Sequence, residues 1–223
     1  MVKSDKFKLK SWYSVMAPKI FDEKKIGDVI GLEDANVLDR IIVTNLTELT
    51  GEMPHSYTRI HLRVVDIKGK TAYTALVGHE LLRSYLRTLV RRRMSLVDDV
   101  VKVRTRDGVE VAVKTAIVAS NKISQSTRVA LRKIAETVIR EKASKADYDS
   151  FMQEVLFRKL SSAVYGKVKL VVPIKRVEII KTELIESKKK SIKKLLMAEQ
   201  PVPEVLAEET EVPAEETGAP AAA

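Results

Sequence analysis

The 223-residue chain contains no cysteine and few aromatic residues, and both absences limit what it can do. Without cysteine there are no disulfides, no zinc sites built on thiolates and no cysteine nucleophile. Aromatic residues make up only 5% of the chain, which favours an interaction protein over an enzyme with a large ligand pocket. No apolar run reaches the length of a membrane span, and the charged first ten residues lack the apolar centre of a signal peptide. We therefore expect a cytoplasmic protein that does not bind membranes.

Catalytic and metal-binding motifs are missing as well. The chain has no nucleophile elbow, no phosphate-binding loop, no dinucleotide-binding glycine fingerprint and no zinc-binding His-Glu-x-x-His. His55 and His61 would lie roughly 20 Å apart along a strand, which is too far for one metal ion. His79 is expected at a strand-to-helix corner, as a capping or solvated residue. We expect no catalytic residue, no metal and no cofactor, and hence no enzyme.

What the chain does have is positive charge, and that charge is unevenly placed. There are 40 Lys and Arg against 30 Asp and Glu, a formal net charge of +10. Residues 198–223 hold seven glutamates and no Lys or Arg, which leaves +17 for residues 1–197. A body this positive favours a polyanionic partner. Nucleic acid is the first candidate, because each neutralised phosphate releases counterions.

Hydrophobic periodicity predicts an α+β fold, a mostly antiparallel β-sheet or barrel with helices packed around it. Alternating or β-branched runs predict strands over residues 37–44, 57–65, 71–77, 100–106, 109–118 and 167–181. Turn residues 68–70 and the Asp107-Gly108 pair predict hairpins, and Pro173 predicts an edge position or a bulge in the last strand. Helical spacing predicts helices over residues 81–93, 126–142, 144–156 (running on irregularly toward 164) and 182–197. Ser126 and Ser144 are the expected N-caps of the second and third helices.

Composition and charge along the sequence predict four regions. Residues 1–20 mix lysine with apolar residues without a helical stripe, which indicates a basic N-terminal arm. Residues 21–182 form the globular domain, and residues 183–197 a basic helix. That helix could lie on an anionic membrane, but its short apolar face and the acidic segment after it favour RNA. Residues 198–223 contain four of the seven prolines and no aromatics, so we expect a disordered acidic tail.

Several cationic rows are candidate RNA contacts, although any one of them could equally be a solvated face. Arg83, Arg87 and Arg91 recur every four residues on the predicted helix 81–93, and Arg59 and Arg63 share the outer face of a predicted strand. Arginine holds phosphate, and aromatic faces stack on bases. Charge and position give these candidates: Lys3, Lys6, Lys8, Lys24, Lys25, Arg59, Arg63, Arg83, Arg87 and Arg91.

Several stretches together resemble one family. The run Lys-Ser-Trp-Tyr-Ser-Val-Met-Ala-Pro over residues 10–18 is similar to the opening of the archaeal and eukaryotic-type small-subunit ribosomal protein one family, also called the S-three-a family. Thr-Arg-Asp-Gly at 105–108 resembles its central hairpin, the basic run 128–134 its basic helix, and Pro-Ile-Lys-Arg-Val-Glu at 173–178 its closing strand. The resemblance spans residues 8–181. The absence of cysteine and the short Ala/Glu/Pro tail resemble an archaeal member.

The resemblance implies a structural component of the small ribosomal subunit, on the platform near the messenger-RNA exit. Its implied partners are small-subunit ribosomal RNA, neighbouring small-subunit proteins and messenger RNA near that exit, with no membrane. Carried over onto this sequence, it implies RNA contacts at Lys10, Trp12, Tyr13, Lys19, Lys122, Arg128, Arg132 and Lys133. We thus expect a ribosome-bound cytoplasmic ribonucleoprotein component that functions in translation and binds rRNA.

An alternative from another class remains open at this point. The chain could be a non-ribosomal RNA-binding or protein-partner regulatory module, with the acidic tail imitating nucleic acid when the body is unoccupied. Deletion of residues 198–223 distinguishes these alternatives. If the tail competes with RNA, its removal should tighten RNA binding, most of all at low ionic strength.

Overall fold

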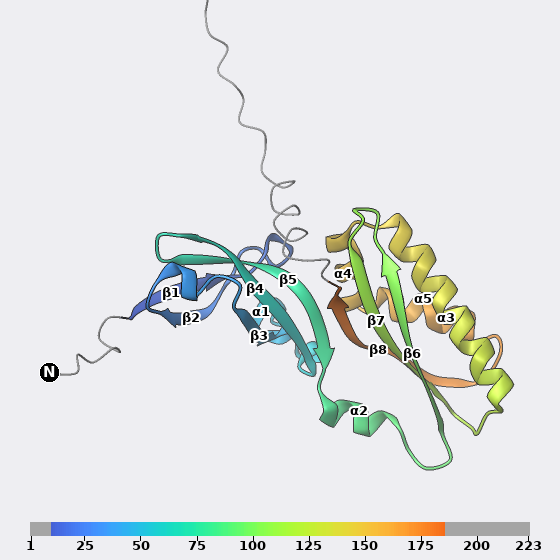
Figure 1. Ribbon diagram of the computed structural model, residues 1–223. Helices are drawn as coiled ribbons and strands as arrows, with labels where there is room; N and C mark the ends of the chain where they lie inside the picture. Colours follow the sequence, from blue (N-terminus) through green and yellow to red (C-terminus); the bar gives the residue numbers. More distant parts are fainter. Residues whose placement is uncertain (1–9, 186–223) are drawn as a thin grey trace, which may run out of the picture.

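The computed structural model describes residues 10–185, which fold into an α+β structure. An eight-stranded, mostly antiparallel open sheet runs through the molecule, and Figure 1 shows its two ends spreading into two lobes. We call residues 10–82 the N-terminal lobe and residues 83–185 the C-terminal lobe. The α+β class and the mostly antiparallel sheet predicted from the sequence are confirmed, and the sheet is open.

The N-terminal lobe is built almost entirely of strands. Its elements are β1 (Ser11–Met16), β2 (Lys25–Gly31), β3 (Ile41–Asn45), α1 (Leu46–Thr50), β4 (Thr58–Lys68) and β5 (Thr71–Leu81), with short 3-10 turns at Lys19–Phe21, Asp34–Asn36 and Met53–His55. The β4–β5 hairpin turns at Gly69, whose φ of 63° suits glycine. Along β4 the buried Ile60, Leu62 and Val64 alternate with more exposed polar residues, as the period-two pattern predicts.

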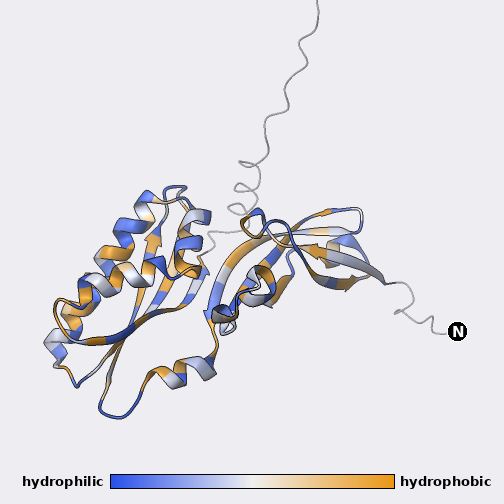
Figure 2. Ribbon diagram, turned by 180° about the vertical axis from the view of Figure 1, so that it is seen from behind, coloured by the Kyte–Doolittle hydropathy of each residue, from blue (hydrophilic) through white to orange (hydrophobic). Residues whose placement is uncertain are grey.

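The C-terminal lobe places helices on the inner face of a three-stranded meander. Its elements are α2 (Arg83–Leu89), β6 (Ser95–Arg104), β7 (Glu110–Ala119), α3 (Gln125–Lys145), α4 (Tyr148–Leu156), α5 (Lys159–Val168) and β8 (Ile174–Leu184). The predicted Asp107-Gly108 turn joins β6 to β7, with Gly108 at φ 78°. Figure 2 shows the apolar sides of the helices turned toward the strands. Phe151, Leu160 and Leu131, from three different helices, are fully buried there.

The two lobes join where β5 meets β8. The strand order is β2-β1-β5-β8-β7-β6, with β4 also paired to β5 and β3 to β4. The β5–β8 seam consists of three pairs, Gly78 to Glu80 against Glu183 to Lys181. The backbones approach so closely that a Cβ on Gly78 would lie 2.1 Å from the carbonyl oxygen of Thr182. Behind the seam, the buried Tyr148 hydroxyl donates a hydrogen bond to the carbonyl of Leu76 (2.9 Å).

The β-sheet begins earlier in the chain than the sequence suggests. Residues 11–16 were expected in a basic arm, but they form β1, which pairs antiparallel with β2 and parallel with β5. The alternation of Tyr13 and Val15, both buried, with Trp12 and Ser14 is the strand signal that the surrounding lysines mask. The part of the predicted arm before residue 10 lies outside the described residues.

Three predicted boundaries are wrong by a few residues. Helix α3 is capped by Ser124, whose hydroxyl accepts from the amide of Thr127, so its N-cap is not Ser126. The N-cap of α4 is Asp147 rather than Ser144, because α3 continues to Lys145. The region toward residue 164 forms a separate helix, α5, because Arg158 adopts a left-handed backbone (φ 60°) between α4 and α5.

The position of the last strand also differs from the prediction. Strand β8 is central, between β5 and β7, whereas Pro173 had suggested an edge. The proline is tolerated because it precedes the strand and only its carbonyl is used, by the amide of Ser120. A register shift beside Ala119 provides the bulge that was the other alternative. Strand β8 runs to Leu184, so a helix does not begin at residue 182; the rest of that predicted helix and the acidic tail lie outside the described residues.

None of the helices within residues 10–185 is long and apolar enough to cross a membrane.

Candidate nucleic-acid interface

Charge divides between the two lobes. The N-terminal lobe has nine Lys and Arg against ten Asp and Glu, so it is close to neutral. The C-terminal lobe has 23 Lys and Arg against 11 Asp and Glu, a net charge of +12. The site that attracts a polyanion should therefore be sought on the C-terminal lobe.

Within the C-terminal lobe, cations gather in three segments that contain no acidic residue. Residues 81–97, 111–135 and 155–177 together hold 16 Lys and Arg and no Asp or Glu. Carboxylates elsewhere in the lobe cancel part of the positive potential, but inside these segments nothing does. Their position in the fold decides whether they form one surface.

The sheet topology brings these three segments to one end of the molecule. Strand β6 begins, β7 ends and β8 begins at the same level, because Ser95 pairs with Ala119 and Ala119 pairs with Ile174. The three loops attached there are residues 90–94, 120–124 and 169–173. Each loop lies inside one acid-free segment, so the topology makes one basic surface from three distant stretches of chain.

Local contacts hold the three loops together. The amide of Ile123 donates to the hydroxyl of Ser95 (3.2 Å), and the amide of Ser120 donates to the carbonyl of Pro173 (3.1 Å). The ammonium of Lys175 lies 3.9 Å from the sulfur of Met94. The loops are thus held on the ends of paired strands, which gives their cationic side chains a fixed base.

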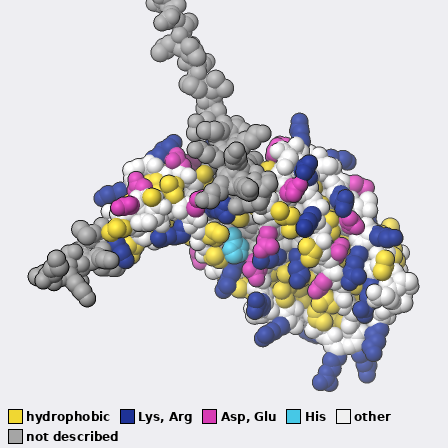
Figure 3. Space-filling view, in the orientation of Figure 1, with side chains coloured by type: hydrophobic (Ala, Val, Ile, Leu, Met, Phe, Trp, Pro, Cys, Tyr) yellow, Lys and Arg dark blue, Asp and Glu magenta, His cyan; other side chains and the backbone are white. Residues whose placement is uncertain are grey.

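We call the exposed cations of this surface the basic end. They are Arg91, Arg92, Arg93, Lys122, Lys169 and Lys175. The first carboxylates met along the strands are Asp98 on β6 and Glu178 on β8, and Glu178 is buried. Figure 3 shows Lys and Arg protruding from the lower end of the larger lobe, below and beside α2 as placed in Figure 1. Leu170, 87% exposed, projects among these cations.

The N-terminus of α3 lies at the same end. This helix of 21 residues starts directly after the 120–124 loop. Its dipole and first amides add positive potential on the side where Lys122 and Arg128 lie. The orientation of the longest helix therefore reinforces the basic end.

The predicted arginine row of α2 is not a single helical row. Arg83 and Arg87 are exposed on α2, but the helix ends at Leu89 because Val90 adopts an extended backbone. Arg91 lies beyond the helix, in the loop that belongs to the basic end. The chain changes direction at Arg93, which has a left-handed φ of 69°.

The cations predicted on α3 lie near the basic end but differ in their contacts. Lys133 is exposed, whereas Arg128 is half-buried. Arg132 is also half-buried, and its Nε donates to the main-chain carbonyl of Asp98 at 3.0 Å. Arg132 therefore covers a backbone acceptor of the edge strand β6, which is a structural role.

The cations predicted on the N-terminal lobe do not join the basic end. Arg59 and Arg63 lie on the outer face of β4, opposite Asn45 and Ile41 of β3. The ammonium of Lys25 pairs with Asp28 at 2.8 Å, and that of Lys24 donates to a backbone carbonyl. Lys10 and Lys19 are exposed in this lobe, whose acidic residues balance its basic ones. Three further candidates, Lys3, Lys6 and Lys8, lie outside the described residues.

The predicted aromatic pair splits between core and surface. The Tyr13 ring is buried in a small core with Val15, Val37 and Val64, and its hydroxyl donates to Asp34 (2.6 Å). This hydrogen bond raises the pKa of Tyr13, and the buried ring has no free face for a base. Trp12 is 60% exposed, because successive side chains of a strand alternate between its two faces.

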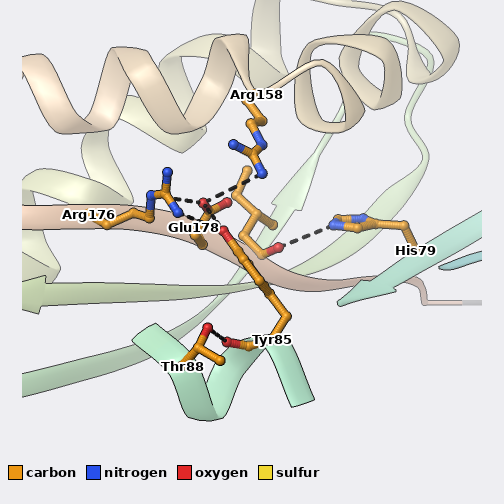
Figure 4. A network of polar contacts seen from close by, with 7 residues as sticks. His79, Tyr85, Thr88, Arg158, Arg176 and Glu178 are labelled. Atoms are coloured by element: carbon orange, nitrogen blue, oxygen red, sulfur yellow. Dashed lines mark hydrogen bonds and ion pairs between the residues drawn. The ribbon is translucent and has the colours of Figure 1, made fainter. Parts of the chain in front are cut away.

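A buried carboxylate connects α2 to the helices beside the basic end (Figure 4). Glu178 of β8 accepts a hydrogen bond from the hydroxyl of Tyr85 (3.0 Å) and lies 3.6 Å from Arg176 and 3.9 Å from Arg158. Tyr85 stacks on Tyr57 with ring centroids 3.9 Å apart. Burial and the Glu178 charge raise the pKa of Tyr85 to about 12, so its hydroxyl stays protonated as a donor. The network fixes α2 on the body and so positions the loop that follows it.

His79 and His55 make structural contacts. His79 is buried rather than solvated at a corner, with its Nδ1 2.7 Å from the hydroxyl of Thr182 and its Nε2 3.2 Å from the carbonyl of Ile179. Burial lowers its pKa to about 4. His55 packs edge-on against Phe157. Over residues 10–185, no group of three acidic or histidine side chains could hold a metal ion.

Sequence reasoning missed Lys169 and Lys175 and gave no particular weight to Arg92 and Arg93. The signal that would have found them is the absence of acidic residues over three long stretches, rather than helical spacing of arginines. That signal gains meaning only when the strand register shows that the three stretches end side by side.

Comparison with known proteins identifies the family of the chain. Residues 1–188 match the model of the Ribosomal S3Ae family. The chain is 38% identical over 182 residues to a protein of Saccharolobus islandicus (strain L.S.2.15), covering 82% of this chain and 88% of that protein. It is 37% identical over 186 residues to a protein of Sulfolobus acidocaldarius, covering 83% and 94% respectively. Both relatives are archaeal and are named small ribosomal subunit protein eS1. The chain therefore belongs to the Ribosomal S3Ae family, a family of structural ribosomal proteins and not of enzymes.

Proposed function

We propose that this protein is a structural component of the small ribosomal subunit that binds ribosomal RNA through the basic end. The observation that carries the proposal is the convergence of three acid-free segments at one end of the sheet. Its small-subunit relatives supply the setting, in which the abundant polyanion is ribosomal RNA. The protein is then ribosome-bound in the cytoplasm.

Binding through the basic end should depend strongly on salt concentration. Each phosphate neutralised on a double helix contributes about 0.9 to the slope of log affinity against log salt, and about 0.7 on a single strand. The six cations of the basic end, if all engaged, make the affinity fall by several orders of magnitude between low and high salt. Leu170, exposed among them, offers an apolar contact to a base or sugar at the same surface.

The position within the subunit rests on the family. The family resemblance supports a place on the platform near the messenger-RNA exit, where the basic end contacts ribosomal RNA. Messenger RNA passing that exit is a further partner for the same chemistry. The exposed Trp12 of β1 and Lys10, which precedes this strand, offer a second, smaller contact, and Lys3, Lys6 and Lys8 are further candidates earlier in the sequence.

The N-terminal lobe suits neighbouring ribosomal proteins better than RNA. It is nearly neutral, and its edge strand β3 exposes Ile41 and Val43 on the face opposite the core (49% and 51% exposed). Exposed apolar side chains on a lobe without net positive charge favour a protein contact, although Arg59 and Arg63 of β4 lie on the same face. Binding of RNA and of protein is thereby assigned to different lobes.

The basic end is tested by exchanging three of its lysines. The variant K122Q/K169Q/K175Q is compared with K25Q/K68Q/K70Q, which removes the same charge from exposed lysines of the N-terminal lobe. Affinity for small-subunit RNA is measured by filter binding from 50 to 300 mM KCl. We expect the first variant to lose at least tenfold in affinity at 100 mM and to reduce the salt slope by about 2 to 3.

The comparison of the two triple variants can also contradict the proposal. Equal losses in the two triple variants would mean that only net charge matters, and the basic end would then have no special role. Circular dichroism and thermal unfolding of both variants show whether the fold is kept, and the exposure of all six lysines makes that the expected result.

A further inference from the structure

The segment that follows the described structure has the chemistry of a ligand for the basic end. Residues 198–223 contain seven glutamates and neither Lys nor Arg. The basic end presents six exposed cations, five in loops that contain no carboxylate and Lys175 at the start of β8. The two parts of the same chain are therefore complementary in charge, as RNA and the basic end are.

The length of chain allows the contact. The described residues stop at Ile185, whose amide donates to the carbonyl of Glu110 at the opposite end of β7 and β8 from the basic end. Strand β8 has eleven residues and so spans about 36 Å. Residues 198–216 alone can extend to about 60 Å, at about 3.3 Å per residue. The glutamates can therefore reach the basic end in the same molecule.

The cations nearer to residues 198–223 are too few to neutralise the charge of this acidic segment. Residues 186–197 hold five lysines and one glutamate, so they cannot balance seven negative charges. The N-terminal lobe has one more acidic than basic residue and offers no net attraction. The basic end is thus the place on the described surface where an anionic segment gains most.

We propose that the acidic segment 198–223 binds the basic end when RNA is absent and is displaced by ribosomal RNA. This regulation rests on the proposed function, because it uses the same surface. Tethering makes the segment an intramolecular competitor with a high effective concentration. Weak, non-specific RNAs are then excluded, whereas ribosomal RNA, which makes further contacts of its own, displaces the segment.

The test removes the negative charge of residues 198–223 without shortening the protein. All seven glutamates from Glu199 to Glu216 are replaced by glutamine in the full-length protein, and binding of a uridine 20-mer is measured at 50 and 300 mM KCl. We expect the glutamine variant to bind about tenfold more tightly than the natural protein at 50 mM, and the two to converge at 300 mM as salt screens the contact. Deletion of residues 198–223 should have the same effect.

Crosslinking locates the contact. A carbodiimide joins a glutamate to a lysine within contact distance, and peptides linking 198–223 to Lys122, Lys169 or Lys175 are expected in the RNA-free protein. Addition of ribosomal RNA should abolish these crosslinks. Crosslinks confined to Lys188, Lys189, Lys190, Lys193 and Lys194 would overturn the inference.

The inference and the proposed function fail in different ways. If the glutamine variant binds RNA and the natural protein binds it equally well at 50 mM, the inference is overturned while the RNA-binding surface stands. If neither form binds ribosomal RNA, the proposed function itself is wrong. In the variant K122Q/K169Q/K175Q, replacing the seven glutamates of residues 198–223 by glutamine should change the affinity for the uridine 20-mer much less than it does in the natural protein.

Discussion

At the scale of single residues, ionisable groups in the interior of this protein have structural partners, whereas the cations of the basic end are exposed to solvent. Glu178 is 4% exposed, yet Tyr85, Arg158 and Arg176 surround its carboxylate. A buried charge with such partners costs little while the set is complete and much when one member is removed. The cations of the basic end are exposed, so their replacement should affect binding and leave stability almost unchanged.

Replacing Glu178 by glutamine tests the first half of that contrast. E178Q keeps the shape of the side chain but leaves Arg158 and Arg176 without their shared anion. We expect the free energy of unfolding to fall by about 1.5–3 kcal/mol, the range for hydrogen bonds to charged groups, since both arginines are partly solvated. E183Q, at an exposed glutamate paired with Lys181, should change it by less than about 0.5 kcal/mol in urea unfolding. Equal effects would show that burial of Glu178 is unimportant.

His79 predicts a pH dependence whose sign follows from its burial. Burial lowers the folded-state pKa to about 4 from an ordinary value near 6.5, so between these pH values the unfolded chain binds the extra proton. Stability should be fully present above pH 6.5 and should fall on acidification by up to about 1.4 kcal/mol per pH unit. Urea unfolding between pH 7.5 and 5 should show a shallower decline in H79N than in the natural protein. The same slope in H79N as in the natural protein would contradict the assignment of this pH dependence to His79.

At the scale of elements, sequence patterns identified most of the fold because local rules decide hairpins and amphipathic helices. Both hairpin turns and the alternating burial along β4 follow from glycine positions and period two. The starts of α3 and α4 were misplaced because several serine and aspartate residues nearby could cap them, and only packing selects among them. The central place of β8 was missed because its pairing with β5 joins residues about a hundred positions apart, which no local pattern encodes.

For the site residues too, features set by local sequence were predictable, and features set by long-range packing were not. Exposure of Lys122, Lys133 and Trp12 could be predicted from alternation and polarity. The burial of Tyr13 could not, because the small core that encloses it contains Val37 and Val64 from distant parts of the chain. The basic end itself depends on strand register, and this is why Lys169 and Lys175 emerged only from the structure.

Gly78 tests the seam between the lobes. A Cβ at this position would meet the Thr182 carbonyl at 2.1 Å, and neither backbone can move without breaking the three-pair contact of β5 and β8. We expect G78A to lose at least about 3 kcal/mol of stability, the upper end of the usual overpacking cost. G27A is the matched control, because a Cβ on Gly27 has no neighbour within 4 Å. Denaturant unfolding with similar midpoints for the two variants would contradict this account.

At the scale of the whole molecule, the two lobes differ in charge and hence in the partners that they suit. The C-terminal lobe carries +12, and the N-terminal lobe is nearly neutral with apolar side chains exposed on β3. If RNA and protein contacts are separated in this way, damage to one lobe should leave the partner of the other lobe unaffected.

The double variant I41D/V43D tests that separation. Both side chains are about half exposed, so the fold should survive, and affinity for isolated small-subunit RNA should stay within about twofold of the natural protein. Incorporation into small subunits in competition with the natural protein should fall severalfold, because the apolar protein contact is lost. The reverse pattern, weakened RNA binding with normal incorporation, would reassign the face of β3 to RNA.

The seam between β5 and β8 also has a consequence for biosynthesis. Hairpins β1–β2 and β4–β5 join neighbouring stretches and can form as soon as they are made, whereas β8 is the last strand of the described structure to be translated. Until it arrives, β5 and β7 each present an unpaired edge, and the loops of the basic end lack their third member. A nascent chain therefore completes the proposed RNA-binding surface only after β8 has been translated, so we expect RNA engagement to follow the joining of the two lobes.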